Sequence, residues 1–99
     1  MNATPLVYHV LLYDLVDDYL ERRPAHRPDH LRLLGEAQRR GEVVMAGALA
    51  DPADLALLVF RDPEAARRFA EADPYVRAGL VTRWRVRPWN VVVVPPTAG

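Results

Sequence analysis

Four apolar segments of strand length constrain the fold of this chain most. Residues 5–13 (PLVYHVLLY), 42–49 (EVVMAGAL) and 55–60 (LALLVF) are short runs of mainly apolar side chains. Residues 80–94 form a longer run, in which Arg alternates with apolar or hydroxyl side chains over residues 82–87. The sequence therefore predicts four strands.

Prolines mark the starts of the helices between these strands. Pro28 suits the first helical position, where its missing N–H costs nothing, so one helix is predicted over residues 28–40. Asp62 and Asp73 each precede a proline and are predicted N-caps, of a helix that ends before Pro74 and of a shorter helical piece after it. The order βαββαβ predicts an α+β, ferredoxin-like fold, with one antiparallel sheet and both helices on one face.

Both faces of the predicted sheet need a cover. Three of the four predicted strands, residues 5–13 and 55–60 among them, are apolar on both faces, whereas the helices cover only one face. We therefore expect a homodimer in which two sheets pack face to face. Residues 14–23 are expected to be a surface connection that holds one short helical turn.

Length and composition limit the function. Ninety-nine residues predict one domain over residues 1–99, with a frayed tail at 95–99. No Cys is present, so disulfides and thiolate chemistry are excluded, and the absence of Lys excludes a Schiff base. The balance of 13 basic and 13 acidic residues argues against nucleic-acid binding. No apolar run is long enough to span a membrane and no signal pattern is visible, so we expect a cytoplasmic protein.

His30 is the first candidate for chemistry. It falls in the first turn of the predicted helix, and its ring is expected to point toward the seam between helix and sheet. There a neutral imidazole can act as a general base, although a histidine that only satisfies a core hydrogen bond is the alternative. His26 lies four residues earlier, but Pro28 separates the two and no third ligand is spaced to join them. Neither a metal site nor a cofactor is therefore predicted.

Asp73, Tyr75 and the Arg residues are the other candidates. Asp73 is either a helix cap alone or a partner of His30, and Tyr75 can form a wall of a pocket. Arg83, Arg85 and Arg87 share one face of the last strand. They are either a solvated face, ion pairs at a dimer rim, or a clamp for a substrate carboxylate.

Several segments together resemble the YciI-like family, whose unit is the YCII-related domain. These segments are VLLYD (10–14), RPDHL (27–31), AGALADP (46–52), ADPYV (72–76) and VRPW (86–89). The resemblance implies a ferredoxin-like dimer of the dimeric α/β-barrel superfamily, with a His-Asp pair as the proposed active site. Here these roles fall on His30 and Asp73. The motif Arg-Pro-x-His also occurs at residues 23–26, which leaves His26 as a second choice, but only His30 is followed by Leu and a continuing helix.

These observations predict a small-molecule enzyme in which Asp73 orients His30 as general base. Tyr75, Arg27 and Arg83 are expected to hold a small organic anion. The resemblance implies proton abstraction with elimination or isomerisation, on small and often chlorinated or aromatic-derived molecules. The alternatives are a non-catalytic dimeric module that binds a metabolite or serves an accessory role, and a haem or metal binder with His30 as axial ligand.

Overall fold

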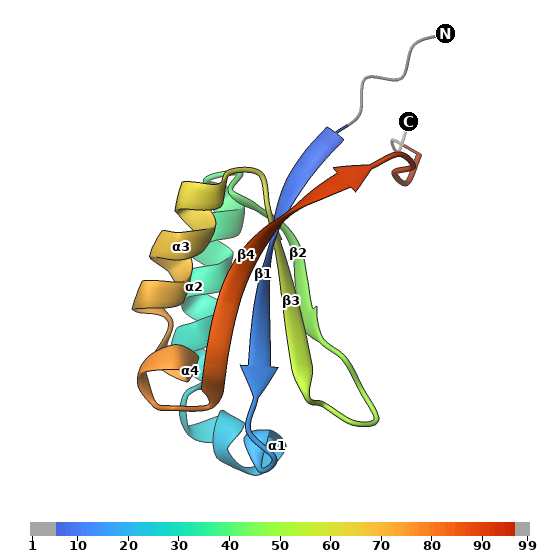
Figure 1. Cartoon of the computed structure of the whole chain (residues 1–99). Coiled ribbons are helices and arrows are strands. Elements are labelled where there is room, and N and C mark those ends of the chain that lie inside the picture. Colours follow the sequence, from blue (N-terminus) through green and yellow to red (C-terminus); the bar gives the residue numbers. More distant parts are fainter. Residues whose placement is uncertain (1–5, 97–99) are drawn as a thin grey trace, which may run out of the picture.

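A four-stranded antiparallel sheet with two main helices on one face forms the body of the protein (Figure 1). The structure is a computed structural model and describes residues 6–96. The strands lie in the order β2-β3-β1-β4. The elements are β1 (Leu6–Leu15), α1 (Tyr19–Arg22), the 3-10 turn η1 (Arg23–Ala25), α2 (Arg27–Arg39), β2 (Val43–Ala48), β3 (Leu55–Phe60), α3 (Pro63–Ala72), α4 (Pro74–Arg77) and β4 (Val81–Val91).

This architecture confirms the ferredoxin-like prediction, and β3 has the predicted limits. Strand β1 runs two residues further than expected, to Leu15, because Asp14 and Leu15 still pair with β4. Strand β4 ends at Val91, opposite Leu6, and not at residue 94. Pro5 and residues 97–99 of the expected tail lie outside the described residues.

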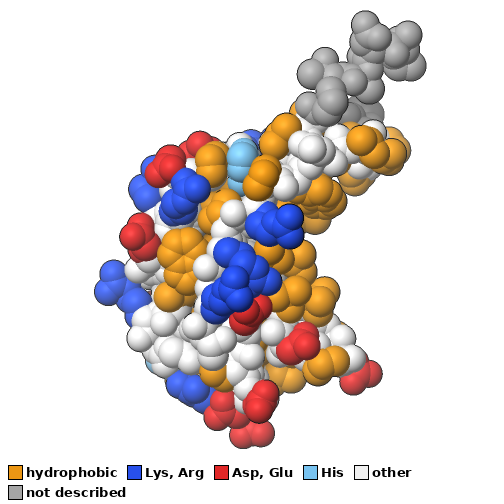
Figure 2. Space-filling model, in the orientation of Figure 1, with side chains coloured by type: hydrophobic (Ala, Val, Ile, Leu, Met, Phe, Trp, Pro, Cys, Tyr) orange, Lys and Arg blue, Asp and Glu red, His pale blue; other side chains and the backbone are white. Residues whose placement is uncertain are grey.

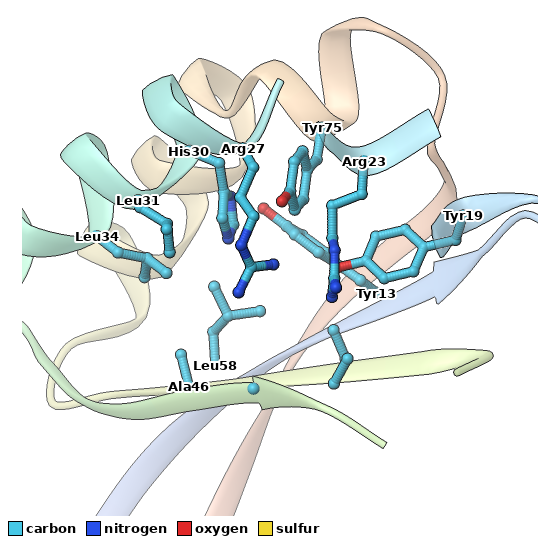
Figure 3. A pocket seen from close by; sticks show the side chains of 13 residues that line it. Tyr13, Tyr19, Arg23, Arg27, His30, Leu31, Leu34, Ala46, Leu58 and Tyr75 are labelled. Atoms are coloured by element: carbon cyan, nitrogen blue, oxygen red, sulfur yellow. The ribbon is translucent and has the colours of Figure 1, made fainter. Parts of the chain in front are cut away.

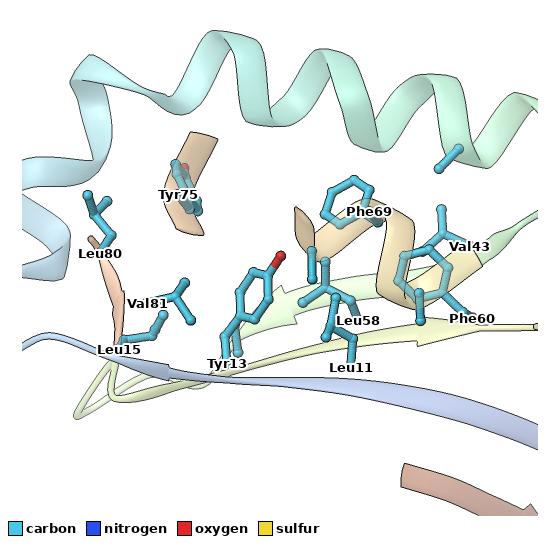
Figure 4. Packing of buried hydrophobic residues seen from close by; sticks show 14 of the residues in the cluster. Leu11, Tyr13, Leu15, Val43, Leu58, Phe60, Phe69, Tyr75, Leu80 and Val81 are labelled. Carbon is cyan, nitrogen blue, oxygen red and sulfur yellow. The ribbon is translucent and has the colours of Figure 1, made fainter. Parts of the chain in front are cut away.

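Alternate residues of the central strands build the core. Leu11 of β1 pairs with Leu58 of β3 and Val86 of β4, and Tyr13 lies beside these residues on the same face. Their side chains point toward the helices and meet Phe69 of α3 in a continuous apolar layer (Figure 4). The two-residue period of a strand therefore fixes which side chains lie beneath the helices.

The caps set where the second half of the chain turns. The Asp62 carboxylate accepts a hydrogen bond from the amide N–H of Ala65 at 3.1 Å and starts α3 as predicted. The Asp73 carboxylate accepts from the amide N–H of Tyr75 at 3.0 Å and starts α4. Since α4 is only one turn long, this cap brings Tyr75 directly beneath the first turn of α2.

The segment after β1 was predicted to be a surface connection, and that prediction is wrong for part of it. Its helical turn exists as α1, followed by η1, but Tyr19 is only 4 % exposed. The Tyr19 ring packs edge-on against Tyr75, with ring centroids 5.8 Å apart. An apolar contact with α4 therefore folds α1 onto the body of the protein.

The face of the sheet away from the helices carries apolar side chains and Arg residues. Val10 and Leu12 of β1 and Leu57 and Val59 of β3 lie on it, and Figure 2 shows hydrophobic side chains gathered on this side of the molecule. On this face, Arg85 of β4 donates a hydrogen bond to Asp14 of the neighbouring strand β1 at 3.1 Å. Within residues 6–96, no helix is both long and apolar enough to cross a membrane.

Candidate active site

His30 lies in the first turn of α2 with its ring held between two aromatic side chains. The residue is 8 % exposed. The Tyr75 ring stacks on the imidazole with centroids 3.8 Å apart and planes 9° apart, and Phe69 presents its edge at 6.1 Å. These contacts fix the plane of the imidazole. The ring lies at the seam between helix and sheet, where the sequence predicted it.

Asp73 is fully buried and binds the same imidazole. Its Oδ1 lies 2.9 Å from Nδ1 of His30, and its Oδ2 lies 3.1 Å from the same atom. Oδ2 also accepts the hydroxyl of Tyr13 at 2.7 Å, while Oδ1 accepts the amide N–H of Tyr75. Asp73 is thus both a helix cap and the partner of His30, so the two roles are not exclusive.

This network assigns the tautomer of His30. An ionised carboxylate can only accept hydrogen bonds, and Asp73 already accepts one from a phenol and one from an amide. The ring nitrogen that faces it must therefore donate, so the proton of the neutral imidazole lies on Nδ1. Nε2 then carries the lone pair and makes no hydrogen bond within residues 6–96. Because His30 lines a cavity, this lone pair is available to a bound molecule.

Tyr13 is a member of the site that the sequence did not single out. Burial, followed by the charge of Asp73 and the hydrogen bond to it, raises the pKa of the Tyr13 phenol far above its usual value of 10.0. Tyr13 therefore stays a neutral donor to the carboxylate. The available signal was a tyrosine on the core face of a strand, since a buried hydroxyl needs a partner.

The cavity has a volume of about 130 Å³ and lies between the start of α2 and the sheet (Figure 3). The guanidinium groups of Arg23 and Arg27 point into it from the helix side. Burial raises the pKa of Tyr75 to about 12, a rise that Tyr19 increases and the two Arg residues reduce, so its hydroxyl is neutral near pH 7. The lining residues are Tyr13, Tyr19, Arg23, Arg27, His30, Leu31, Leu34, Ala46, Gly47, Ala48, Ala56, Leu58 and Tyr75.

The described residues contain no group of three or more His, Asp or Glu side chains placed to hold a metal ion. The only His-carboxylate contact in residues 6–96 is the pair formed by His30 and Asp73. The arrangement therefore offers a proton acceptor beside two cations and a phenol.

Comparison with known proteins places the chain in a family. The sequence model of the YCII-related domain matches residues 7–90, nearly the whole of the chain. The chain belongs to the YCII-related domain family. Proteins named YciI from Escherichia coli O6:H1 and from Shigella flexneri are each 32 % identical to it over 98 residues, covering 88 % of this chain and 99 % of theirs.

A solved structure shares the fold of this YCII-related domain. It is the 5-chloro-2-hydroxyhydroquinone dehydrochlorinase TftG from Burkholderia phenoliruptrix AC1100, in complex with 2,5-dihydroxybenzoquinone. The TM-score is 0.68 at 17 % sequence identity, and the match covers 84 % of this chain and 93 % of that one. The likeness confirms the fold class.

The YCII-related domain brings most of the predicted site residues together. His30, Arg27 and Tyr75 line the cavity, and Asp73 lies directly behind His30. Arg83 does not join them, because it lies opposite Asp14 in the pairing of β4 with β1 and therefore on the face away from the helices.

The two Arg-Pro-x-His motifs of the YCII-related domain are used differently. His30 of the second motif contacts Asp73, whereas His26 of the first motif occupies the N-cap position of α2 and does not line the cavity. The arginines of both motifs line it. Arg23 was not among the predicted site residues, because the segment that carries it was expected to lie on the surface.

Proposed function

We propose that this YCII-related domain is a small-molecule enzyme in which His30 acts as general base. One observation carries the proposal: Asp73 holds Nδ1 of a buried His30 at 2.9 Å, while the imidazole lines a cavity. A base oriented in this way, with its second nitrogen free, is suited to remove a proton from a bound molecule. Asp73 then stabilises the imidazolium that forms, since its carboxylate lies against the newly charged ring.

The dimensions of the cavity support a substrate of the size of one ring. An engineered apolar cavity of about 150 Å³ is known to bind benzene, and the cavity here measures about 130 Å³. Its walls are mainly apolar side chains, to which Arg27 and Tyr75 add polar groups that can bind oxygen atoms. TftG, which has the same fold, is named for dehydrochlorination of a hydroxylated, chlorinated ring.

We therefore assign the reaction to proton abstraction coupled to elimination or isomerisation. In an elimination, Nε2 of His30 takes a proton from a substrate O–H or C–H bond, and the released electron pair moves to form a new double bond. A leaving group such as chloride departs with its own electron pair from the adjacent position. The proton passes from His30 to solvent, so the net products are the unsaturated molecule and HCl.

A pair of matched histidine variants tests this proposal. His30→Asn keeps a side chain of similar polarity but removes the base, whereas His26→Asn changes the corresponding residue of the other motif. Wild type is incubated under anaerobic conditions with 5-chloro-2-hydroxyhydroquinone, and chloride release is measured. A panel of ring-sized hydroxy and carbonyl compounds in D₂O is followed by NMR for deuterium uptake at carbon.

Removing a general base typically lowers the rate by about 10²- to 10⁴-fold, so His30→Asn is expected to lose at least about a hundredfold. His26→Asn is expected to retain the wild-type rate, because its side chain makes no cap hydrogen bond and does not line the cavity. Equal turnover by wild type and His30→Asn would contradict the assignment. A ligand that binds without being changed, in wild type and His30→Asn alike, would favour the non-catalytic module.

We also propose that the protein is a homodimer formed through the open face of the sheet. Val10 and Val59 of this face are already buried, but Met45, on the same face, is 57 % exposed, and Trp89 is 48 % exposed. Contiguous apolar surface of this kind marks a protein contact. Arg83 then belongs to the interface, where it can pair with a carboxylate of the second copy, and not to the substrate contact expected from the sequence.

A further inference from the structure

Two buried polar atoms at the cavity lack a hydrogen-bond partner within residues 6–96. They are Nε of Arg23 and the hydroxyl of Tyr75, beside which the Arg27 side chain lies without forming a hydrogen bond of normal geometry. Tyr75 is only 2 % exposed, and both residues line the cavity. Buried polar groups are nearly always hydrogen-bonded, so two orphaned groups at one cavity indicate that a ligand supplies the missing partner. Arg Nε–H can only donate, and a neutral phenol can donate, so an acceptor on the ligand satisfies both.

The charge of the cavity indicates the sign of that ligand. Arg23 and Arg27 are four residues apart, and their guanidinium groups point into the cavity from the same wall (Figure 3). Neither forms an ion pair with a carboxylate of the described residues, and no Asp or Glu lines the cavity. By contrast, Arg32, further along α2, donates to Glu36 at 3.2 Å. The cavity therefore carries positive charge that the lining residues do not balance.

Arg23 is held in position before a ligand arrives. Its guanidinium carbon lies 5.3 Å from the centroid of the Tyr19 ring, a distance at which a cation is attracted to an aromatic face. Tyr19 is itself fixed by its edge-on contact with Tyr75. The turn α1, which contributes Tyr19, therefore orients a cation toward the same space that His30 faces.

We propose that Arg23 and Arg27 together bind anionic oxygens of the ligand, and that the Tyr75 hydroxyl donates a further hydrogen bond to the same group. The ligand class is a small, ring-sized organic anion with two oxygens at one edge, either a carboxylate or two neighbouring ring hydroxyls of which one is ionised. Two planar guanidinium groups present several N–H donors, so they bind a group with two oxygens better than a group with a single oxygen. The inference relies on the proposed function only for placing this anion against His30, where the cations also stabilise negative charge left by proton removal.

Equilibrium binding tests the inference without any need for turnover. Benzoate and benzamide have almost the same shape and differ in charge, and salicylate with salicylamide forms a second such pair. Binding of each to the wild-type protein is measured by NMR titration at low and at high salt. The acids are expected to bind at least about tenfold more tightly than the amides, because hydrogen bonds to charged groups are the stronger ones, and added salt is expected to reduce that difference.

Two variants then locate the charge recognition. Arg23→Gln is expected to weaken binding of benzoate or salicylate by at least about tenfold and to leave the amides unchanged. Arg32→Gln removes the same charge outside the cavity and is expected to bind as wild type does. Circular dichroism checks that each variant folds, and if Arg23→Gln does not, the acid-amide comparison in wild type decides.

Any of three results would overturn the inference. They are equal affinity for acid and amide, unchanged benzoate and salicylate affinity in Arg23→Gln, and a dissociation constant above about 10 mM for both acids. The proposed function fails on a different result, which is a His30→Asn variant that turns over substrate as wild type does. Loss of one proposal therefore leaves the other open to its own test.

Discussion

The hydroxyl of Tyr13 offers the sharpest test of how the site is held together. Tyr13→Phe keeps the buried ring and removes one hydrogen bond of 2.7 Å to a fully buried carboxylate. Hydrogen bonds to charged groups contribute about 1.5 to 3 kcal/mol, so we expect the free energy of unfolding to fall by about 2 kcal/mol. For a domain of this size such a loss lowers the melting temperature by roughly 8 to 16 °C.

Urea unfolding followed by circular dichroism measures the change at one fixed protein concentration, because dimer dissociation would otherwise alter the midpoint. Tyr8→Phe is the matched control. Tyr8 lies on the same strand, is only partly buried and makes no side-chain hydrogen bond among the described residues. We expect its effect to stay within about 0.5 kcal/mol.

A double-mutant cycle with Asp73→Asn assigns the loss to the contact itself. If the hydroxyl acts through the carboxylate, Tyr13→Phe costs clearly less when Asp73 is already replaced. A loss of the same size in both backgrounds would refute the reasoning, as would a Tyr13→Phe protein that is as stable as wild type.

The same contact gives the stability difference a pH dependence. Burial and the neighbouring charge raise the pKa of Tyr13 in the folded protein, whereas the phenol of the unfolded chain keeps a value near 10.0. Above that pH the unfolded chain loses a proton that the folded protein retains, so unfolding becomes easier as pH rises. The advantage of wild type over Tyr13→Phe is therefore complete below pH 10 and declines above it.

Two further predictions concern the cap residues and the open face. Asp73→Asn is expected to lower the free energy of unfolding by about 2 to 4 kcal/mol, because an amide has one acceptor oxygen for the three donors that the carboxylate binds. Asp62→Asn alters only a helix cap and is expected to cost about 1 kcal/mol or less. Equal losses in urea unfolding would contradict a special role for Asp73. Leu57→Asp places a charge on the open face of the sheet. The variant is expected to be a monomer in analytical ultracentrifugation at concentrations where wild type is a dimer. A wild-type protein that is a monomer at micromolar concentration would contradict the proposed interface.

Local patterns predicted most of the fold. The limits of β3 follow from six apolar residues between two turns, and the start of α3 follows from Asp62 and the proline after it. Such signals act within a few residues, so they can be read along the chain. The strand ends at Leu15 and Val91 were harder to place, because they depend on pairing between β1 and β4, which lie far apart in the sequence.

The site was predictable only in part, for the same reason. His30 and Asp73 are 43 residues apart, and Tyr13 and Asp73 are 60 apart, so no local pattern joins them. The family resemblance supplied the first pair. The second was not predicted, because a tyrosine on the core face of a strand indicates that its hydroxyl needs a partner but not which residue that partner is. Arg23 was missed because its segment is rich in charged residues and was expected to lie on the surface, and only the burial of Tyr19 shows that the segment folds over the cavity.

The carboxylate of Asp73 joins three separate elements, since its donors come from β1, α2 and α4. None of these donors belongs to a long loop, and each is fixed by the packing of the core. The imidazole is therefore preorganised: its orientation is set when the chain folds and requires no rearrangement as a ligand enters. An active site of this kind gives up adaptability, so new substrates are more readily accommodated by changing the walls of the cavity than by moving its base.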